Sequence, residues 1–125
     1  MTVETRENEG PLPIVIDDFR NLAACADAMT WKPFRDGVEL HQIYGTMGQP
    51  GPSACLLRFQ PGAKVPRHSH TGYEHIFVLS GSQADDRGIY RAGSVLISPP
   101  GTDHAITSDE GCIVLAVYQS PVAFE

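Results

Sequence analysis

Three histidines and one glutamate occur in this sequence at spacings that suit a metal site. His68 and His70 are two residues apart, so in an extended strand their imidazoles point to the same face. A tight turn at Thr71-Gly72 then lets Glu74 return beside them in a hairpin, and further along the chain a Pro-Pro-Gly corner precedes His104. We predict that His68, His70, Glu74 and His104 bind one metal ion.

The predicted ligands are three imidazole nitrogens and one carboxylate oxygen, with no sulfur. This set suits one divalent transition metal ion, zinc or iron(II) first, and it also accepts manganese, nickel or copper. Four protein ligands complete a tetrahedral zinc site, whereas the same four leave one or two positions open on a five- or six-coordinate iron or manganese. The identity of the metal therefore decides much of the function.

Other residues that could contribute to such a site each have a more ordinary alternative. If Glu74 points into a barrel, strand alternation places His75 on the opposite face, so we do not expect it to be a ligand. His41 lies in a predicted strand whose inner face the sequence does not identify. Arg58 lies in an apolar strand, where it either reaches a cavity to orient an anion or lies along the surface. The four tyrosines either line a pocket or pack in the core.

Length and charge restrict the class of protein. A chain of 125 residues suits one domain with its own hydrophobic core, so we predict a single domain over residues 1–125. The net charge of -6 and the scattered basic residues argue against nucleic acid binding. No apolar run approaches the ~20 residues of a membrane span, and the acidic N-terminus is unlike a signal peptide. We expect a cytoplasmic protein with no nucleic acid or membrane partner.

The three cysteines, Cys25, Cys55 and Cys112, are odd in number and widely spaced. Neither a disulfide framework nor a thiolate zinc site follows from this spacing. We expect Cys55 and Cys112 to be small core residues within strands, and a redox role for Cys25 stays open.

The pattern of apolar residues predicts an all-β fold. Residues 1–11 have no apolar periodicity and should be mobile, residues 12–16 can form a short strand, and Asp17 or Asp18 can cap a brief helix. From Trp31 onward, glycine and proline interrupt short apolar runs about every ten residues. The predicted strands are residues 38–44, 53–60, 64–70, 74–79, 82–85, 88–90, 94–97, 104–107 and 112–118, with a hairpin at 85–88.

Two stretches resemble the paired motifs of the cupin superfamily. Residues 62–81 match the first motif at Gly62, His68, His70, Glu74 and Gly81. Residues 93–108 match the second motif at Gly93, Pro99, Gly101 and His104. Only Ser108 departs, since the family often has Asn there. The resemblance implies an antiparallel double-stranded β-helix, or jelly-roll barrel, with at most one short N-terminal helix.

Three further runs, residues 31–39, 51–62 and 110–115, resemble the cupin domain of ChrR-type anti-sigma factors. In those proteins a metal-binding cupin is the sensory half, while a separate helical domain with its own zinc site binds the sigma factor. The thirty residues that precede Trp31 are too few for that helical domain and carry no His/Cys zinc set. The resemblance, which spans residues 31–118, therefore implies a sensory module and does not extend to an anti-sigma role.

Two functions of different class follow from the predicted site. In the first, the protein senses a small ligand or oxidant at the metal without catalysis. In the second, it is a metalloenzyme, specifically an iron(II)-dependent dioxygenase acting on a small organic substrate, and the fold does not decide between the two. Because a small sandwich leaves sheet edges open and cupins commonly pair with a copy of themselves, we also expect a homodimer, with residues 12–16 as the added strand.

Overall fold

One short helix and ten strands make up the computed structural model of the chain, which describes residues 10–125. The helix, η1, spans Phe19–Ala28 and precedes every strand. The strands are β1 (Lys32–Arg35), β2 (Val38–Tyr44), β3 (Ser53–Phe59), β4 (Ala63–Ser69), β5 (Glu74–Asp85), β6 (Gly88–Arg91), β7 (Val95–Ser98), β8 (Asp103–Ser108), β9 (Cys112–Tyr118) and β10 (Ala123–Phe124).

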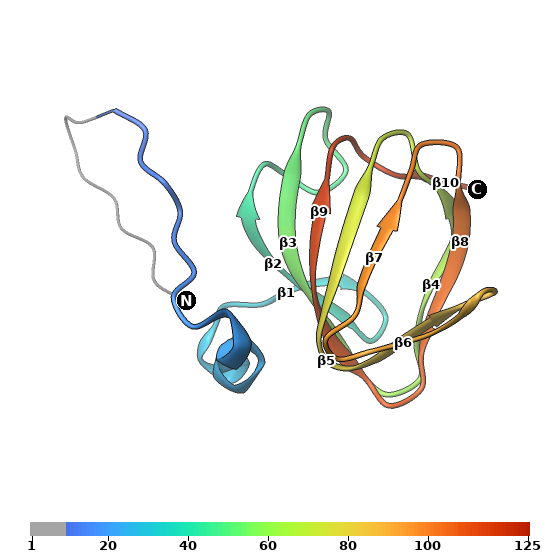
Figure 1. Ribbon diagram of the computed structural model, residues 1–125, viewed down its shortest axis with the longest axis horizontal. Coiled ribbons are helices and arrows are strands. Elements are labelled where there is room, and N and C mark those ends of the chain that lie inside the picture. Colours follow the sequence, from blue (N-terminus) through green and yellow to red (C-terminus); the bar gives the residue numbers. More distant parts are fainter. Residues whose placement is uncertain (1–9) are drawn as a thin grey trace.

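All of the strand pairs are antiparallel, and together they form one sheet that curls on itself. The strand order is β1-β2-β3-β9-β5-β8-β4-β10, with β6 and β7 both paired to β5. Figure 1 shows β2, β3 and β9 on one side of the fold and β4 and β8 on the other. Within the described residues, this architecture confirms the predicted cupin jelly roll with at most one short helix.

The longest strand, β5, joins the two sides of the fold. Its first half pairs with β7 and β9, and its second half pairs with β6 and β8. The sequence predicted two separate strands here, residues 74–79 and 82–85. The strand instead continues through a bend at Gly81. This position requires glycine, because its φ is +70° and a Cβ would collide with the carbonyl oxygen of Gly111.

Side chains that point into the curled sheet form the main apolar core. Strand β9 shows the alternation clearly, since Cys112, Val114, Ala116 and Tyr118 are buried while the residues between them are partly exposed. Cys55 of β3 belongs to the same core. The predicted burial of two cysteines is therefore confirmed, and Cys25 is exposed.

The helix η1 packs on the outer face of the sheet. Leu22 is 2% exposed, and the ring of Phe19 lies edge-on against Phe77 of β5, with ring centroids 6.3 Å apart. The predicted helix is present as a 3-10 helix, and Asp18 occupies its N-cap position as one of the two predicted residues. The Asp18 side chain does not cap the backbone, and its carboxylate instead accepts a hydrogen bond of 2.6 Å from the Asn21 side chain.

Two other strand predictions also need correction. Residues 12–16 form no strand, and Pro11 and Pro13 lack the backbone donors that a strand would use. Strands β4 and β5 do not form a hairpin, because β4 pairs with β8 and β10 while residues 70–73 cross to the other side of the fold. The predicted strands missed β1, which contains a proline, and β10, which has only two residues.

The mobility predicted for residues 1–11 concerns mostly residues 1–9, which lie outside the described part of the chain. Within residues 10–125, no helix has the length and hydrophobicity of a membrane span.

Candidate metal centre

Four buried side chains from three separate segments meet inside the curled sheet. His68 lies on β4, His70 directly follows that strand, Glu74 begins β5 and His104 lies on β8. Each of the four residues is 1–3% exposed. Each offers one ligand atom, and these atoms lie within 4.8 Å of one another. The structure thus brings together all four residues predicted from the sequence, in an arrangement that could hold a metal ion.

Strand pairing explains how the separate segments converge. His68 and His104 are direct partners in the β4–β8 ladder, and their ring centroids are 4.7 Å apart. The backbone N–H of His70 donates to the carbonyl of Thr102 at 2.9 Å, which holds the end of β4 against the turn before β8. The chain then crosses to β5, so Glu74 reaches the histidines from the opposite side of the fold.

Each of the three histidines uses Nδ1 for a hydrogen bond that points out of the cluster. The acceptors, 2.9 to 3.1 Å away, are the carbonyl of Pro66 for His68, the carbonyl of Thr102 for His70 and the carboxylate of Asp85 for His104. Because carbonyl and carboxylate oxygens only accept, Nδ1 carries the proton and Nε2 keeps its lone pair. All three rings therefore turn a basic nitrogen toward the centre of the cluster.

The atoms that face one another inside the cluster lack donors. Nε2 of His70, Nε2 of His104 and Oε1 of Glu74 are buried without a hydrogen bond partner. Oε1 of Glu74 lies 3.1 Å from Nε2 of His70 and 3.9 Å from Nε2 of His104, and neither contact has hydrogen bond geometry. Buried polar atoms without partners are costly, so electron-rich atoms that converge in this way fit a cation. Three neutral imidazoles and one carboxylate carry one negative charge toward a divalent ion.

Burial and neighbouring charge act differently on two of the histidines. Burial disfavours the protonated ring of His68 and lowers its pKa. Burial opposes protonation of His70 as well, but the negative charge of the neighbouring Glu74 carboxylate favours the protonated ring, and the pKa of His70 is raised. Acid should therefore protonate His70 before His68.

A carboxylate that the sequence assigned only to a hairpin holds His104 in place. Asp85 ends β5, its side chain is 2% exposed, and its Oδ2 accepts from Nδ1 of His104 at 3.0 Å. Its Oδ1 accepts from the Tyr90 hydroxyl and from the backbone N–H of Arg87, both at 2.8 Å. Burial alone would raise the pKa of Asp85, but these donors outweigh it and lower the pKa. The carboxylate stays charged and favours the tautomer of His104 with a free Nε2.

Four other residues considered in the sequence lie outside the cluster. His75 is partly exposed and faces away from Glu74, as strand alternation predicted. His41 lies on the outer side of β2, where its Nδ1 is 2.8 Å from a backbone carbonyl. Ser108, where the second motif departs from its pattern, is fully buried and donates to a β5 carbonyl at 2.6 Å. Arg58 does not enter the interior, and its partners are Glu39, Asp27 and the ring of Trp31.

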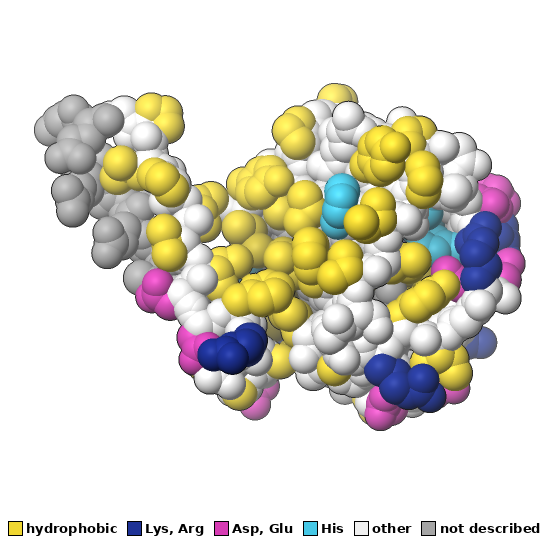
Figure 2. Space-filling model, viewed as in Figure 1, with side chains coloured by type: hydrophobic (Ala, Val, Ile, Leu, Met, Phe, Trp, Pro, Cys, Tyr) yellow, Lys and Arg dark blue, Asp and Glu magenta, His cyan; other side chains and the backbone are white. Residues whose placement is uncertain are grey.

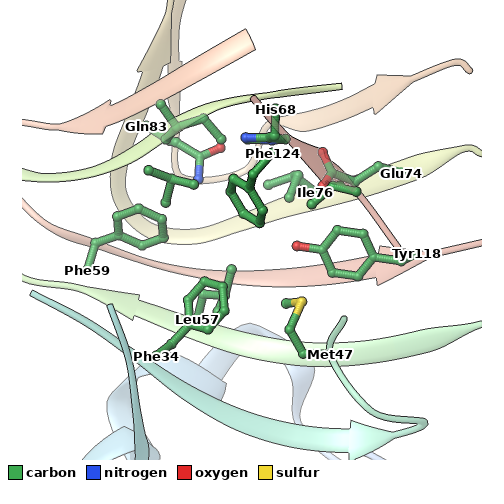
Figure 3. A pocket seen from close by; sticks show the side chains of 13 residues that line it. Phe34, Met47, Leu57, Phe59, His68, Glu74, Ile76, Gln83, Tyr118 and Phe124 are labelled. Atoms are coloured by element: carbon green, nitrogen blue, oxygen red, sulfur yellow. The ribbon is translucent and has the colours of Figure 1, made fainter. Parts of the chain in front are cut away.

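A cavity adjoins the ligand cluster inside the curled sheet (Figure 3). His68 and Glu74 form part of its wall, so a molecule in the cavity would lie against the cluster. Gln83 and the hydroxyl of Tyr118 are the other polar groups in the wall. The apolar wall consists of Phe34, Met47, Leu57, Phe59, Val65, Ile76, Ile106, Val122 and Phe124.

The sequence named Tyr118 only as one of four tyrosines that either line a pocket or pack in the core, and it did not single out Gln83. Tyr118 ends β9, and burial together with the charge of Glu74 raises its pKa well above the ordinary value, so the hydroxyl stays protonated. Its inward direction follows from the alternation of residues 112–118. Gln83 is 2% exposed and its Oε1 has no hydrogen bond partner. No local sequence signal marks Gln83 as a cavity residue.

The comparison with protein families agrees with this geometry. The sequence profile of the family described as the ChrR cupin-like domain matches residues 20–123. The chain belongs to the ChrR cupin-like domain family. The match is longer than the resemblance over residues 31–118 and includes η1 from its second residue onward and the first residue of β10. A comparison with curated proteins found no match.

Solved cupin structures share the fold of this ChrR cupin-like chain at low sequence identity. The complex of Rhodobacter sphaeroides SigE with the anti-sigma ChrR matches with a TM-score of 0.63 and 23% identity, over 88% of this chain and 71% of that chain. An acetylacetone dioxygenase from Acinetobacter johnsonii matches with a TM-score of 0.71 and 14% identity, over 99% of this chain and 84% of that chain.

Two proteins from Ralstonia eutropha JMP134 are longer than the region they share with this chain. An RmlC-like cupin matches with a TM-score of 0.66 and 24% identity, over 77% of this chain and 66% of that chain. A protein with a cupin-like fold matches with a TM-score of 0.60 and 22% identity, over 66% of this chain and 55% of that chain. The chain therefore spans less than two thirds of the length of either protein.

Proposed function

We propose that this ChrR cupin-like chain binds one divalent transition metal ion and, through the metal, a small ligand or oxidant that enters the adjoining cavity. The ligands are His68, His70, Glu74 and His104. The observation that carries the proposal is the convergence of buried Nε2 and Oε1 atoms that lack any donor. Zinc and iron(II) suit three imidazoles and one carboxylate best, and manganese, nickel or copper are compatible.

The chain's own residues prepare the site for such an ion. The outward hydrogen bonds of the three Nδ1 atoms orient the rings, and Glu74 offsets part of the positive charge. The cavity wall is mostly apolar, which lowers the local dielectric and strengthens electrostatic interactions at the site. A bound metal supplies Lewis acidity and open coordination positions.

Elemental analysis of the protein as isolated tests this function. We expect about one equivalent of zinc or iron per chain, because the site has one set of four donors. Calorimetric titration of chelator-treated protein with zinc or iron(II) should then show a single site. Protein that is isolated without metal and takes up none in the titration would contradict the proposal.

A dioxygenase acting on a small organic substrate is the second candidate. The acetylacetone dioxygenase from Acinetobacter johnsonii aligns with 99% of the chain, and the cavity beside the four donors is mostly apolar. Oxygen uptake by the iron(II)-loaded protein, measured with acetylacetone, other small diketones and thiols, tests this role. Substrate-dependent oxygen uptake by the wild type that is absent in His104→Ala would support the dioxygenase role. If the wild type took up no more oxygen than His104→Ala with every compound, the role would be contradicted.

We also propose that the chain forms a homodimer through the outer face of the sheet. Val95 and Ile97 of β7 are 51% and 52% exposed on this face, and Figure 2 shows hydrophobic side chains spread across it. Leu12, Ile14 and Val15 are also exposed, in a segment that lies away from the curled sheet (Figure 1). A second copy would cover both surfaces. Light scattering should give twice the chain mass of 13.6 kDa, and a single chain mass at micromolar concentration would contradict the dimer.

A further inference from the structure

The buried side chain of Gln83 has no assigned partner inside the fold. It is 2% exposed, it lines the cavity beside the ligand cluster, and its Oε1 accepts no hydrogen bond. Figure 3 shows its amide among the cavity side chains, near His68. A buried amide oxygen without a donor is unfavourable, so a group that binds in the cavity and supplies an N–H or O–H would remove that cost.

The charges around the cavity restrict what that group can belong to. None of the described residues in the cavity wall is a lysine or an arginine. Arg35 is close by, but its guanidinium carbon stacks 4.1 Å from the ring centroid of Phe124 and the residue is not part of the wall. Among the described residues of the wall itself, the only positive charge available to a bound molecule would be that of a metal partly neutralised by Glu74. Away from the metal, none of these wall residues can balance an anionic group.

The cavity is also small. Its volume is about 30 Å³, whereas one water molecule needs roughly 10–15 Å³. The space suits a short molecule of a few non-hydrogen atoms beyond those that touch the metal.

We propose that the cavity binds a short organic molecule that coordinates the metal through oxygen at one end, packs an uncharged apolar body against the cavity wall, and hydrogen-bonds to Gln83 through a hydroxyl or amide group. This inference rests on the proposed metal site and deepens it by giving the class of ligand. It excludes dicarboxylates, sugar acids and phosphorylated compounds, whose second charge would lie in the apolar part of the cavity. Gln83 selects the ligand and is not a metal ligand.

Hydroxamic acids provide a test, because the metal-binding end stays constant while the tail changes. Butanohydroxamic acid has an apolar tail, 3-hydroxypropanohydroxamic acid has a tail of the same size ending in a hydroxyl, and malonic acid monohydroxamate has a charged tail. Their affinities would be measured by calorimetry on manganese-loaded protein, since the four protein ligands leave coordination positions open on manganese, with metal content determined on the same samples. The variants are Gln83→Leu and, as the matched control, Gln60→Leu, since Gln60 is an exposed glutamine outside the cavity wall.

We expect the hydroxyl-tailed compound to bind wild type at least as tightly as the apolar one, and the charged compound to bind at least tenfold more weakly. In Gln83→Leu the affinity of the hydroxyl tail relative to the apolar tail should fall about five- to tenfold, the usual effect of one hydrogen bond. Metal content should be unchanged. Gln60→Leu should behave as wild type. The metal-free Gln83→Leu protein should melt no lower than wild type, since the substitution removes an unpartnered polar group.

Three results would overturn the inference. The first is loss of metal in Gln83→Leu, which would make Gln83 a ligand. The second is a preference between the two uncharged tails that Gln83→Leu leaves unchanged. The third is a charged tail that binds wild type as tightly as the apolar tail does. A failure of the underlying metal site gives a different result. Wild type would then take up no manganese, or it would bind all three compounds equally well in the presence and absence of manganese.

Discussion

Two charged clusters of this protein differ in how their charges are satisfied. In the exposed cluster, Arg67 donates to Asp86 at 2.9 Å and to Asp103 at 3.0 Å, and the three side chains are 37–57% exposed. In the buried cluster, the histidines form hydrogen bonds outward, while inward-facing atoms of His70 and Glu74 have no donor. The charges of the exposed cluster satisfy one another, whereas the buried cluster leaves inward-facing acceptors that a cation could satisfy.

Adjacent residues of one hairpin belong to the two clusters. The side chain of Asp85 is 2% exposed and faces His104, and the side chain of Asp86 is 57% exposed and faces Arg67. Exposed ion pairs contribute little because water solvates both charges when they are apart. A buried charge without a counterion is costly. The same kind of substitution should therefore change metal binding and stability more in the buried cluster than in the exposed cluster.

The largest effect should come from removing a ligand. Alanine in place of any one of His68, His70, Glu74 or His104 should remove most of the bound metal, because each supplies one of the four donors. Metal content would be measured by mass spectrometry on each purified variant, with circular dichroism to confirm folding. The control is His75→Ala, which should keep full occupancy because His75 faces away from the cluster. If His104→Ala kept its metal while His75→Ala lost it, the assigned ligand set would be wrong.

Glu74→Gln should have a smaller effect than Glu74→Ala. The amide keeps an oxygen donor and the volume of the side chain but loses the charge that offsets a divalent ion. We expect metal affinity between those of wild type and Glu74→Ala, with the strongest loss for hard ions such as manganese. Competition titrations with zinc and manganese would measure it, and equal affinity of Glu74→Gln and wild type for manganese would show that the charge is unimportant.

Removing the metal should lower the melting temperature, since an ion that binds only the native state stabilises it. The stabilisation should fade in acid, because imidazole must be neutral to bind metal. Because the pKa of His70 is raised, protons compete with the metal for this ring at a higher pH than for an ordinary histidine. Metal-dependent stabilisation should therefore begin to weaken above about pH 6.5, the ordinary pKa of histidine, and should be lost progressively as the pH falls further. Melting curves with and without chelator from pH 5 to 8 would measure it, and curves that never differ would contradict it.

The two neighbouring aspartates allow a direct comparison of the clusters. Asp85→Asn should weaken metal binding about 10- to 100-fold, because the amide no longer fixes the ring orientation and tautomer of His104. Asp86→Asn should leave metal affinity unchanged. Calorimetric titration of both variants would measure the difference. Equal affinities would mean that the hydrogen bond from His104 to Asp85 has no influence on the site.

The smallest effect should come from Arg67→Ala. Hydrogen bonding and the charge of Arg67 lower the pKa of Asp86 below its ordinary value of 3.8, so this pair stabilises the fold above that pH and loses its effect as the pH falls further. Both side chains are solvated, so the melting temperature at pH 7 should change little, and raising the salt concentration should reduce the change further. A loss of stability as large as that caused by metal removal would contradict the contrast between the clusters.

The ligand residues could be predicted from sequence because they lie at fixed spacings within two short stretches, and simple alternation placed His75 on the other face. Gln83 and Asp85 could not be predicted in the same way. The pairing of β5 with β9 shifts register between Val78 and Ser80. Counting in twos from Glu74 would place Gln83 and Asp85 on the outer face, yet both face the interior.

Long-range pairing set the other limits of prediction. The motif spacing identified four candidate metal ligands. The sequence between His70 and Glu74 predicted a hairpin, but the chain crosses the fold there. Strand β10 is two residues long and forms only against β4, so no local pattern could reveal it. Local spacing thus predicted which residues act together, and the topology decided which neighbours support them.

The position of β10 matters for handling the protein in the laboratory. Val122 and Phe124 form part of the cavity wall, and Phe124 pairs directly with His68 in the β4–β10 ladder. A purification tag joined after Glu125 would therefore start one residue from the cavity wall and next to a proposed metal ligand. A polyhistidine tag at that end would also bring competing imidazoles to the site. Metal contents and ligand affinities should be measured on protein whose tag is at the N-terminus or has been cleaved.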